Sequence, residues 1–103
     1  MPPTRLTDTA ISAALAGLPG WTLTDGKLDR AYVFADFVTA FGFMTQCALV
    51  AERMDHHPDW SNVYKRVDVS LSTHESGGIT AKDVALATAM NRIAAPLLAP
   101  AAG

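Results

Sequence analysis

The stretch DHHPDWSNVY, residues 55–64, constrains the fold more than any other part of the sequence, because its proline separates two periodicities. Before it, apolar residues recur at helical spacing over residues 37–54, and after it residues 67–73 alternate between apolar and polar. Pro58 lacks a backbone N–H, so it can continue neither a helix nor a central strand. The chain must therefore pass from helix to strand here, and two adjacent histidines lie at the junction.

The remaining elements are predicted from caps, turns and periodicity. The sequence predicts a first helix from the cap Thr7 to Pro19-Gly20, followed by a hairpin of residues 21–24 and 27–35 around Asp25-Gly26. A second helix over residues 37–54 is capped by Asp36, and a second hairpin turns near residues 65–66. A last helix follows a capping box from Thr80 to Asp83. This order is α-β-β-α-β-β-α. Because connections are short, we expect an α+β fold: one domain over residues 1–103, with a four-stranded antiparallel sheet and three helices on one face.

The helix predicted over residues 37–54 is apolar on two sides. One stripe contains Phe37, Phe41, Met44, Ala48 and Ala51, and the other contains Phe43, Cys47, Val50 and Met54. One side can cover the sheet, but a chain of 103 residues has little left to cover the other. We therefore expect a partner subunit on this helix. Cys47 is expected to be a small core residue, since no base that could activate it is nearby in sequence.

Charge and hydropathy exclude several classes of protein. The net charge is −2, from eight basic and ten acidic residues without runs, so direct nucleic-acid binding is not expected. No stretch has the roughly 18 apolar residues of a membrane span, and the first residues lack the apolar core of a signal peptide. The sequence predicts a cytoplasmic protein without membrane contact.

Acidic residues at the end of the second helix break a local rule. Glu52 and Asp55 lie where helix carbonyls already carry partial negative charge, so a carboxylate is unfavourable there. The same acids would stabilise a protonated imidazole on His56 or His57. His74, predicted at the end of the fourth strand, also lies at an element boundary. We expect the three histidines to share one cleft.

Each of these residues also has a structural interpretation. A histidine at a helix end is an ordinary cap, and Pro58 and Trp60 could seal the core, or else stack against a flat ligand. Asp83 is already the third residue of a capping box, so it could be a cap alone. A zinc site is disfavoured, because adjacent residues seldom point the same way and no spaced histidine or cysteine pair is present.

A longer pattern resembles a known family. Glu52-x3-His56-His57-Pro58-x-Trp60-x-Asn62-x-Tyr64, followed by Leu71-x-Thr73-His74, Gly78 and Asp83, is similar to the motif of the pterin-4a-carbinolamine dehydratases, and the likeness extends back to Gly20-Trp21. The resemblance implies a cytosolic hydro-lyase that removes water from a 4a-hydroxytetrahydropterin, without metal or organic cofactor. It also implies a four-stranded sheet with helices on one face, assembled as homodimers or homotetramers.

The resemblance also implies site residues. By the match, the catalytic set is His56, His57, His74 and Asp83, and the pterin-binding set is Glu52, Asp55, Pro58, Trp60, Ser72, Thr73 and Glu75. Loss of hydroxide needs a proton donor at oxygen and a base at the neighbouring ring nitrogen, and histidine suits both. We expect His56 and His74 to be this pair and His57 to contact the ring. Two alternative functions stay open. The chain could be a protein-interaction module of the transcription-factor cofactor type, or an enzyme that acts on a different pterin substrate.

Overall fold

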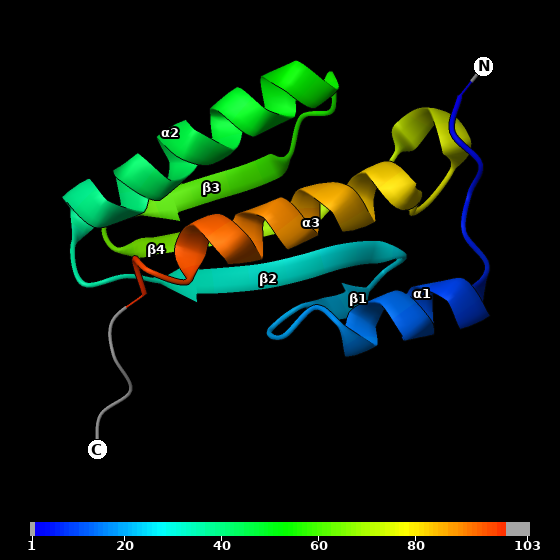
Figure 1. Ribbon diagram of the computed structural model, residues 1–103, viewed down its shortest axis with the longest axis horizontal. Helices are drawn as coiled ribbons and strands as arrows, with labels where there is room; N and C mark the ends of the chain where they lie inside the picture. Colours follow the sequence, from blue (N-terminus) through cyan, green and yellow to red (C-terminus); the bar gives the residue numbers. More distant parts are fainter. Residues whose placement is uncertain (1, 99–103) are drawn as a thin grey trace.

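The computed structural model describes residues 2–98, and its elements follow the predicted order (Figure 1). They are α1 (Asp8–Ala16), β1 (Thr22–Thr24), β2 (Lys27–Val33), α2 (Phe37–Met54), β3 (Asp59–Val63), β4 (Arg66–Leu71), the short 3-10 helix η1 (His74–Ser76) and α3 (Ala81–Ala94). The predicted caps Thr7, Asp36 and Thr80 each begin a helix. The α+β class expected from the sequence is therefore confirmed.

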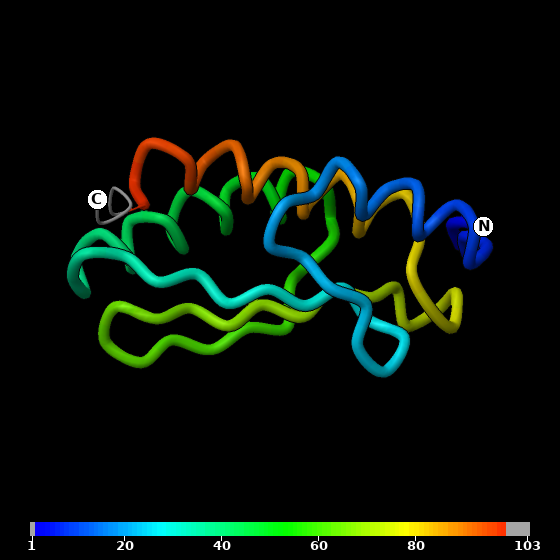
Figure 2. Tube along the Cα trace, turned by 90° about the horizontal axis from the view of Figure 1, so that it is seen from below, coloured from blue at the N-terminus to red at the C-terminus, as the bar shows by residue number. Residues whose placement is uncertain are grey.

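The four strands form one antiparallel sheet in the order β1-β2-β4-β3. Both hairpins pair as predicted, and β2 and β4, which are distant in sequence, pair in the middle of the sheet. Figure 2 shows the three helices on one side of this sheet and the other side uncovered. The fold thus has two layers.

The core lies between these layers. Val67, Val69, Leu71 and Thr73 are all buried, so the alternation read from β4 correctly identifies its inner side. Tyr32 of β2 and Phe43 of α2 meet with ring centroids 4.7 Å apart. This contact fixes α2 over the sheet.

A polar cluster around Asn91 ties α3 to the sheet at the end far from the histidines. The Asn91 side-chain oxygen accepts hydrogen bonds from Tyr32 Oη (2.5 Å), Arg30 Nη1 (2.7 Å) and Trp21 Nε1 (2.8 Å). Its amide nitrogen donates to the carbonyl of Pro19 at 3.1 Å. One residue of α3 therefore holds β2 and the chain before β1, a role that the sequence analysis did not identify.

Only one side of α2 is covered in the single chain. Ala40, Phe43, Cys47 and Ala51 are buried, and burial raises the pKa of the Cys47 thiol to about 12, in line with the core role expected for it. The other side carries Phe37, Val38, Phe41 and Leu49, which are 46% to 79% exposed. We call these four residues the apolar face of α2. Large exposed apolar patches of this kind commonly mark interaction surfaces.

Tyr32 generates a prediction about stability at high pH. Burial raises the pKa of its phenol from 10.0 to about 12. The unfolded chain therefore loses this proton at lower pH than the folded chain, so the contribution of Tyr32 is complete below pH 10 and is lost as the pH rises toward 12. Urea unfolding between pH 8 and pH 11.5 should show the free energy of unfolding falling by roughly 2 kcal/mol more in the wild type than in Tyr32→Phe. An equal fall in both proteins would contradict it.

Candidate active site

The end of α2 positions the adjacent histidines. Asp55 takes a left-handed conformation (φ 51°, ψ 45°), which aspartate tolerates better than most residues. Its N–H donates to the carbonyl of Glu52 at 3.1 Å, and the N–H of His56 donates to that of Ala51 at 3.0 Å. This is the Schellman arrangement, which ends a helix sharply and turns the chain away from its axis. His56 and His57 therefore leave the helix at once, and Pro58 leads into β3.

The loop after β4 presents His74. The sequence predicts His74 at the end of a strand, whereas in the structure β4 ends at Leu71 and His74 begins η1. The strand ends early because Thr73 pairs with Gly78 across the loop, the Thr73 N–H donating to the Gly78 carbonyl at 2.8 Å. Gly77 closes this loop with φ of 73°, a conformation that suits glycine.

The N-terminal segment, residues 3–6, packs against the loop of His74. No feature of the predicted elements indicates this contact. The Leu6 N–H donates to the Ile79 carbonyl at 2.8 Å, and the Ser76 hydroxyl donates to the Pro3 carbonyl. A Cβ on Gly78 would lie only 2.8 Å from Cδ of Arg5, so this position has no room for a side chain unless Arg5 moves. The two adjacent glycines could have indicated this contact in the sequence. Gly77 allows the tight turn, and Gly78 allows Arg5 of the N-terminal segment to approach the backbone closely.

The three histidines line one cleft, as predicted. The cleft has a volume of about 400 Å³, and its lining residues are Asp55, His56, His57, Ser72, Thr73, His74 and Glu75. They come from the end of α2 and from the segment between β4 and α3, which are far apart in sequence. Glu52, Pro58 and Trp60 are not among them. Trp60 lies opposite Val69 on β4 and is half-buried against the core.

Asp83 lies beneath the cleft and is fully buried. Its Oδ1 is 2.6 Å from Nε2 of His56, while its Oδ2 accepts hydrogen bonds from the Thr73 hydroxyl (2.8 Å) and the Thr80 N–H (2.9 Å). The Thr80 bond belongs to the predicted capping box, which is present. The sequence left open whether Asp83 is a helix cap or a partner of a histidine, and its two oxygens do both.

His57 has a similar partner in a different environment. Its Nε2 is 2.8 Å from Oε1 of Glu52, and these side chains are 61% and 79% exposed. The side chain of His56 is only 10% exposed and that of Asp83 is not exposed at all. Charge interactions are weaker in water than in a buried site. The His56 pair is therefore the more tightly constrained of the two.

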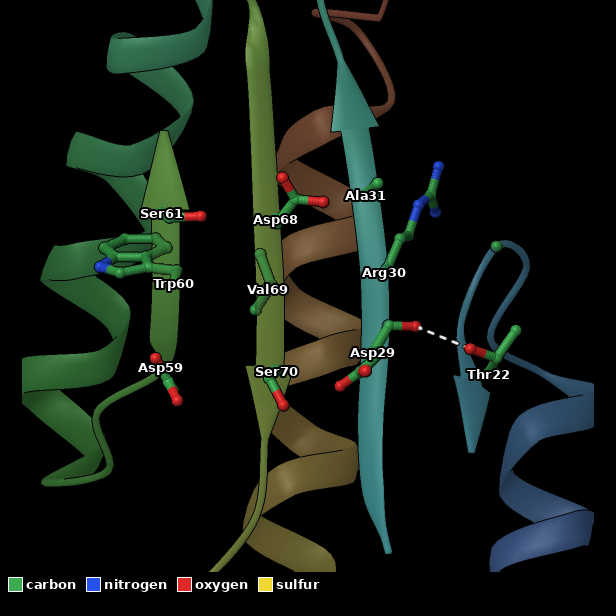
Figure 3. Close-up of a pocket in the computed structure, with 11 residues that line it drawn as sticks. Thr22, Asp29, Arg30, Ala31, Asp59, Trp60, Ser61, Asp68, Val69 and Ser70 are labelled. Carbon is green, nitrogen blue, oxygen red and sulfur yellow. Dashed lines mark hydrogen bonds between the residues drawn. The ribbon is translucent and has the colours of Figure 1, made fainter. Parts of the chain in front are cut away.

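A hollow larger than the histidine cleft lies on the uncovered face of the sheet. It has a volume of about 580 Å³, and Figure 3 shows Asp59, Asp68 and Asp29 along it, on three neighbouring strands. None of the histidines borders it. Within residues 2–98, no group of three or more His, Cys, Asp or Glu side chains could hold a metal ion, and no helix is long and apolar enough to cross a membrane.

Comparison with known proteins identifies the family. A family model described as Pterin 4 alpha carbinolamine dehydratase matches residues 4–93. A protein of Afipia carboxidovorans, provisionally named as a pterin-4-alpha-carbinolamine dehydratase, is 62% identical over 92 residues, which are 87% of this chain and 92% of the relative. One of Bradyrhizobium diazoefficiens with the same name is 59% identical over the same shares.

A solved structure agrees with these sequence matches. The crystal structure of a transcriptional coactivator/pterin dehydratase from Brucella melitensis has a TM-score of 0.87 and 49% identity, and the match covers 88% of this chain and 99% of that one. The motif around the histidine pair, the fold and the family match all lead to the same conclusion. This chain belongs to the pterin-4a-carbinolamine dehydratase family.

Proposed function

We propose that this protein dehydrates a 4a-hydroxytetrahydropterin in the histidine cleft by acid–base catalysis. In this reaction the carbon–oxygen bond of the carbinolamine breaks, and the leaving oxygen takes a proton from an acid to become water. The neighbouring ring nitrogen gives its proton to a base, and the product is the quinonoid dihydropterin. Family membership supports the reaction, and the cleft supports its assignment to these histidines.

The buried contact between His56 and Asp83 is the observation that carries the proposal. Oδ1 of Asp83 is hydrogen-bonded to Nε2 of His56 at 2.6 Å, whereas Nδ1 of His56 makes no hydrogen bond within residues 2–98. In the neutral ring with the proton on Nε2, Nδ1 carries a lone pair that can accept a proton. We therefore assign His56 as the base and His74, across the cleft, as the acid.

The other cleft residues are proposed as pterin contacts. His57, Asp55, Ser72 and Glu75 surround the two catalytic histidines and offer hydrogen-bonding groups to the ring. Glu52 would act through His57, to which it is bonded. Pterin contacts by Pro58 and Trp60, and a cytoplasmic location, stay predictions.

We also propose that the protein forms a homo-oligomer through the apolar face of α2. Phe37 and Phe41 lie side by side there, with ring centroids 5.8 Å apart, and Val38 and Leu49 extend the patch along the helix. A second copy of the same face would cover it by symmetric packing. Such a contact can build either a homodimer or, with a second interface, a homotetramer.

A second candidate function is a role as a protein-interaction module. The relative from Brucella melitensis is described as a transcriptional coactivator as well as a pterin dehydratase, and the exposed apolar face of α2 could bind another protein. The dehydratase is favoured, because a pure interaction module would need neither the buried carboxylate nor the three cleft histidines. Turnover of generated 4a-hydroxytetrahydropterin decides between them.

The three histidines should respond differently to substitution. His56→Ala and His74→Ala should each lower kcat by about 10²-fold, the usual scale for loss of one general acid or base. His57→Ala should raise KM more than it lowers kcat, since its proposed role is contact with the ring. Steady-state kinetics on the pterin carbinolamine provide the measurement. Small, equal effects of all three substitutions would favour the interaction module.

Asp83→Asn should damage both catalysis and stability. Both oxygens of Asp83 have hydrogen-bond partners, so the NH₂ group of an asparagine faces either the Thr80 N–H, which can only donate, or Nε2 of His56, where it favours the tautomer with the proton on Nδ1. We expect kcat to fall by about 10²-fold and the free energy of unfolding to fall by about 1 to 3 kcal/mol. Thr80→Ala, which removes only the capping hydroxyl, should cost about 0.5–2 kcal/mol with a much smaller loss of activity. Wild-type turnover of Asp83→Asn would exclude Asp83 from the active site.

Substitution on the apolar face of α2 should separate the subunits. Phe41→Glu places a charge in the proposed interface, whereas Ala13→Glu places the same charge at an exposed position of α1 and is the control. Sedimentation should show the wild type and Ala13→Glu as oligomers, and Phe41→Glu as a species closer to one chain of 10.9 kDa. A wild-type protein that sediments as a monomer at micromolar concentration would exclude the proposed assembly.

A further inference from the structure

We propose that Thr73 is a positioning residue whose buried hydroxyl holds the Asp83 carboxylate and so fixes the tautomer of His56. The inference rests on the proposed role of His56 as the base. The sequence predicts Thr73 as a pterin contact, but the residue is only 3% exposed and its hydroxyl lies 2.8 Å from Oδ2 of Asp83. It therefore acts on the reaction through other residues.

The direction of each hydrogen bond in this cluster follows from the number of available protons. Oδ2 of Asp83 accepts the Thr80 N–H and the single proton of the Thr73 hydroxyl. Thr73 Oγ1 is also 2.7 Å from Thr80 Oγ1, and since its own proton is used, Thr80 must donate in that bond. Thr80 Oγ1 in turn accepts the N–H of Lys82 at 3.3 Å. The hydroxyls thus form a chain that runs from the start of α3 through Thr73 to Asp83.

This chain determines what Asp83 offers to His56. With two donors at Oδ2, the carboxylate is held in one rotamer, and Oδ1 is directed at Nε2 of His56 at 2.6 Å. An ionised carboxylate can only accept hydrogen bonds, so the proton in this contact is carried by Nε2. A carboxylate partner of this kind selects the tautomer of the ring and its orientation. Nδ1 is then left unprotonated, which is the form that a base requires.

Thr73 also connects the two halves of the cleft. Its backbone N–H closes the loop of His74 by donating to the Gly78 carbonyl, while its hydroxyl reaches the partner of His56. A substitution that keeps the backbone but removes the hydroxyl therefore leaves the loop of His74 in place, while Asp83 loses one donor and the Thr80 hydroxyl loses its acceptor. Thr73→Val does this at nearly constant shape.

The experiment compares Thr73→Val with Thr73→Ser, which restores the hydroxyl, and with Thr88→Val as a matched control. Thr88 is an exposed residue of α3 whose hydroxyl donates to the Val84 carbonyl at 2.7 Å, away from the cleft. Each protein is prepared with ¹⁵N-labelled histidine. The nitrogen chemical shifts of the His56 ring are measured at a pH of about 8, where free imidazole is largely neutral. They report the tautomer without any substrate.

In the wild type, Thr73→Ser and Thr88→Val, we expect shifts typical of a proton on Nε2. In Thr73→Val we expect the two ring shifts to move toward each other as the second tautomer appears. The kcat of Thr73→Val should fall about tenfold, the lower end of what loss of a contact behind a functional histidine produces, with KM little changed. If Thr73→Val does not fold, Thr73→Ala removes the same hydroxyl and is measured in its place.

Unchanged ring shifts in the valine or alanine variant would overturn the inference, even if the variant were less stable, because a merely structural hydroxyl predicts that result. Failure of the proposed function has a different outcome. If the wild-type protein does not turn over the pterin carbinolamine while the His56 shifts respond to Thr73 as expected, the tautomer control stands and the assigned reaction is wrong.

Discussion

The organisation of the candidate active site depends on the hydrogen bonds of the buried Asp83 carboxylate. An ionised carboxylate in the protein interior is costly unless its oxygens are satisfied by hydrogen bonds. Asp83 takes these bonds from three places: its own helix cap at Thr80, the segment just after β4 at Thr73, and the segment just after α2 at His56. The bond with Thr80 is local to the first turn of α3, but the bonds with Thr73 and His56 cannot form unless the end of α2, the segment after β4 and the start of α3 are packed together. The group that orients His56, the proposed base, thus also requires these three parts of the fold to be in place.

The sheet order makes this meeting point possible. Because β4 lies between β2 and β3, its last residues emerge in the middle of the sheet, beneath the helices rather than at an edge. α3 begins there, with Asp83 in its first turn, and is held again about two turns later, where Asn91 accepts hydrogen bonds from Tyr32, Arg30 and Trp21. Two polar clusters fix the helix at both ends, while its apolar residues fill the space between. Such clusters specify one arrangement more strictly than apolar packing does.

The parts of this structure that could be predicted are those encoded over short distances in the sequence. The capping box of Thr80 and Asp83, the Asp25-Gly26 turn and the break at Pro58 each depend on neighbours within a few residues. The packing of Pro3 to Leu6 on the loop of His74 joins segments about seventy residues apart, and no periodicity in the sequence predicts this contact. The Asn91 cluster was missed for the same reason. For Asp83 the sequence offered two roles, and only the positions of both oxygens could show that it has both.

The difference between His56 and His57 explains why two histidines stand side by side at a backbone break. Adjacent side chains outside a helix tend to point in different directions, so at most one of a pair can enter the protein. His56 enters and meets a fully buried carboxylate, whereas His57 stays in solvent with Glu52. In water the second pair is weak and its geometry adjustable, while the first is short and enclosed. A rigid ring suits the transfer of a proton at a fixed atom, and an adjustable ring suits contact with a substrate that must enter and leave. The sharp end of α2 at Asp55 supplies both within two residues.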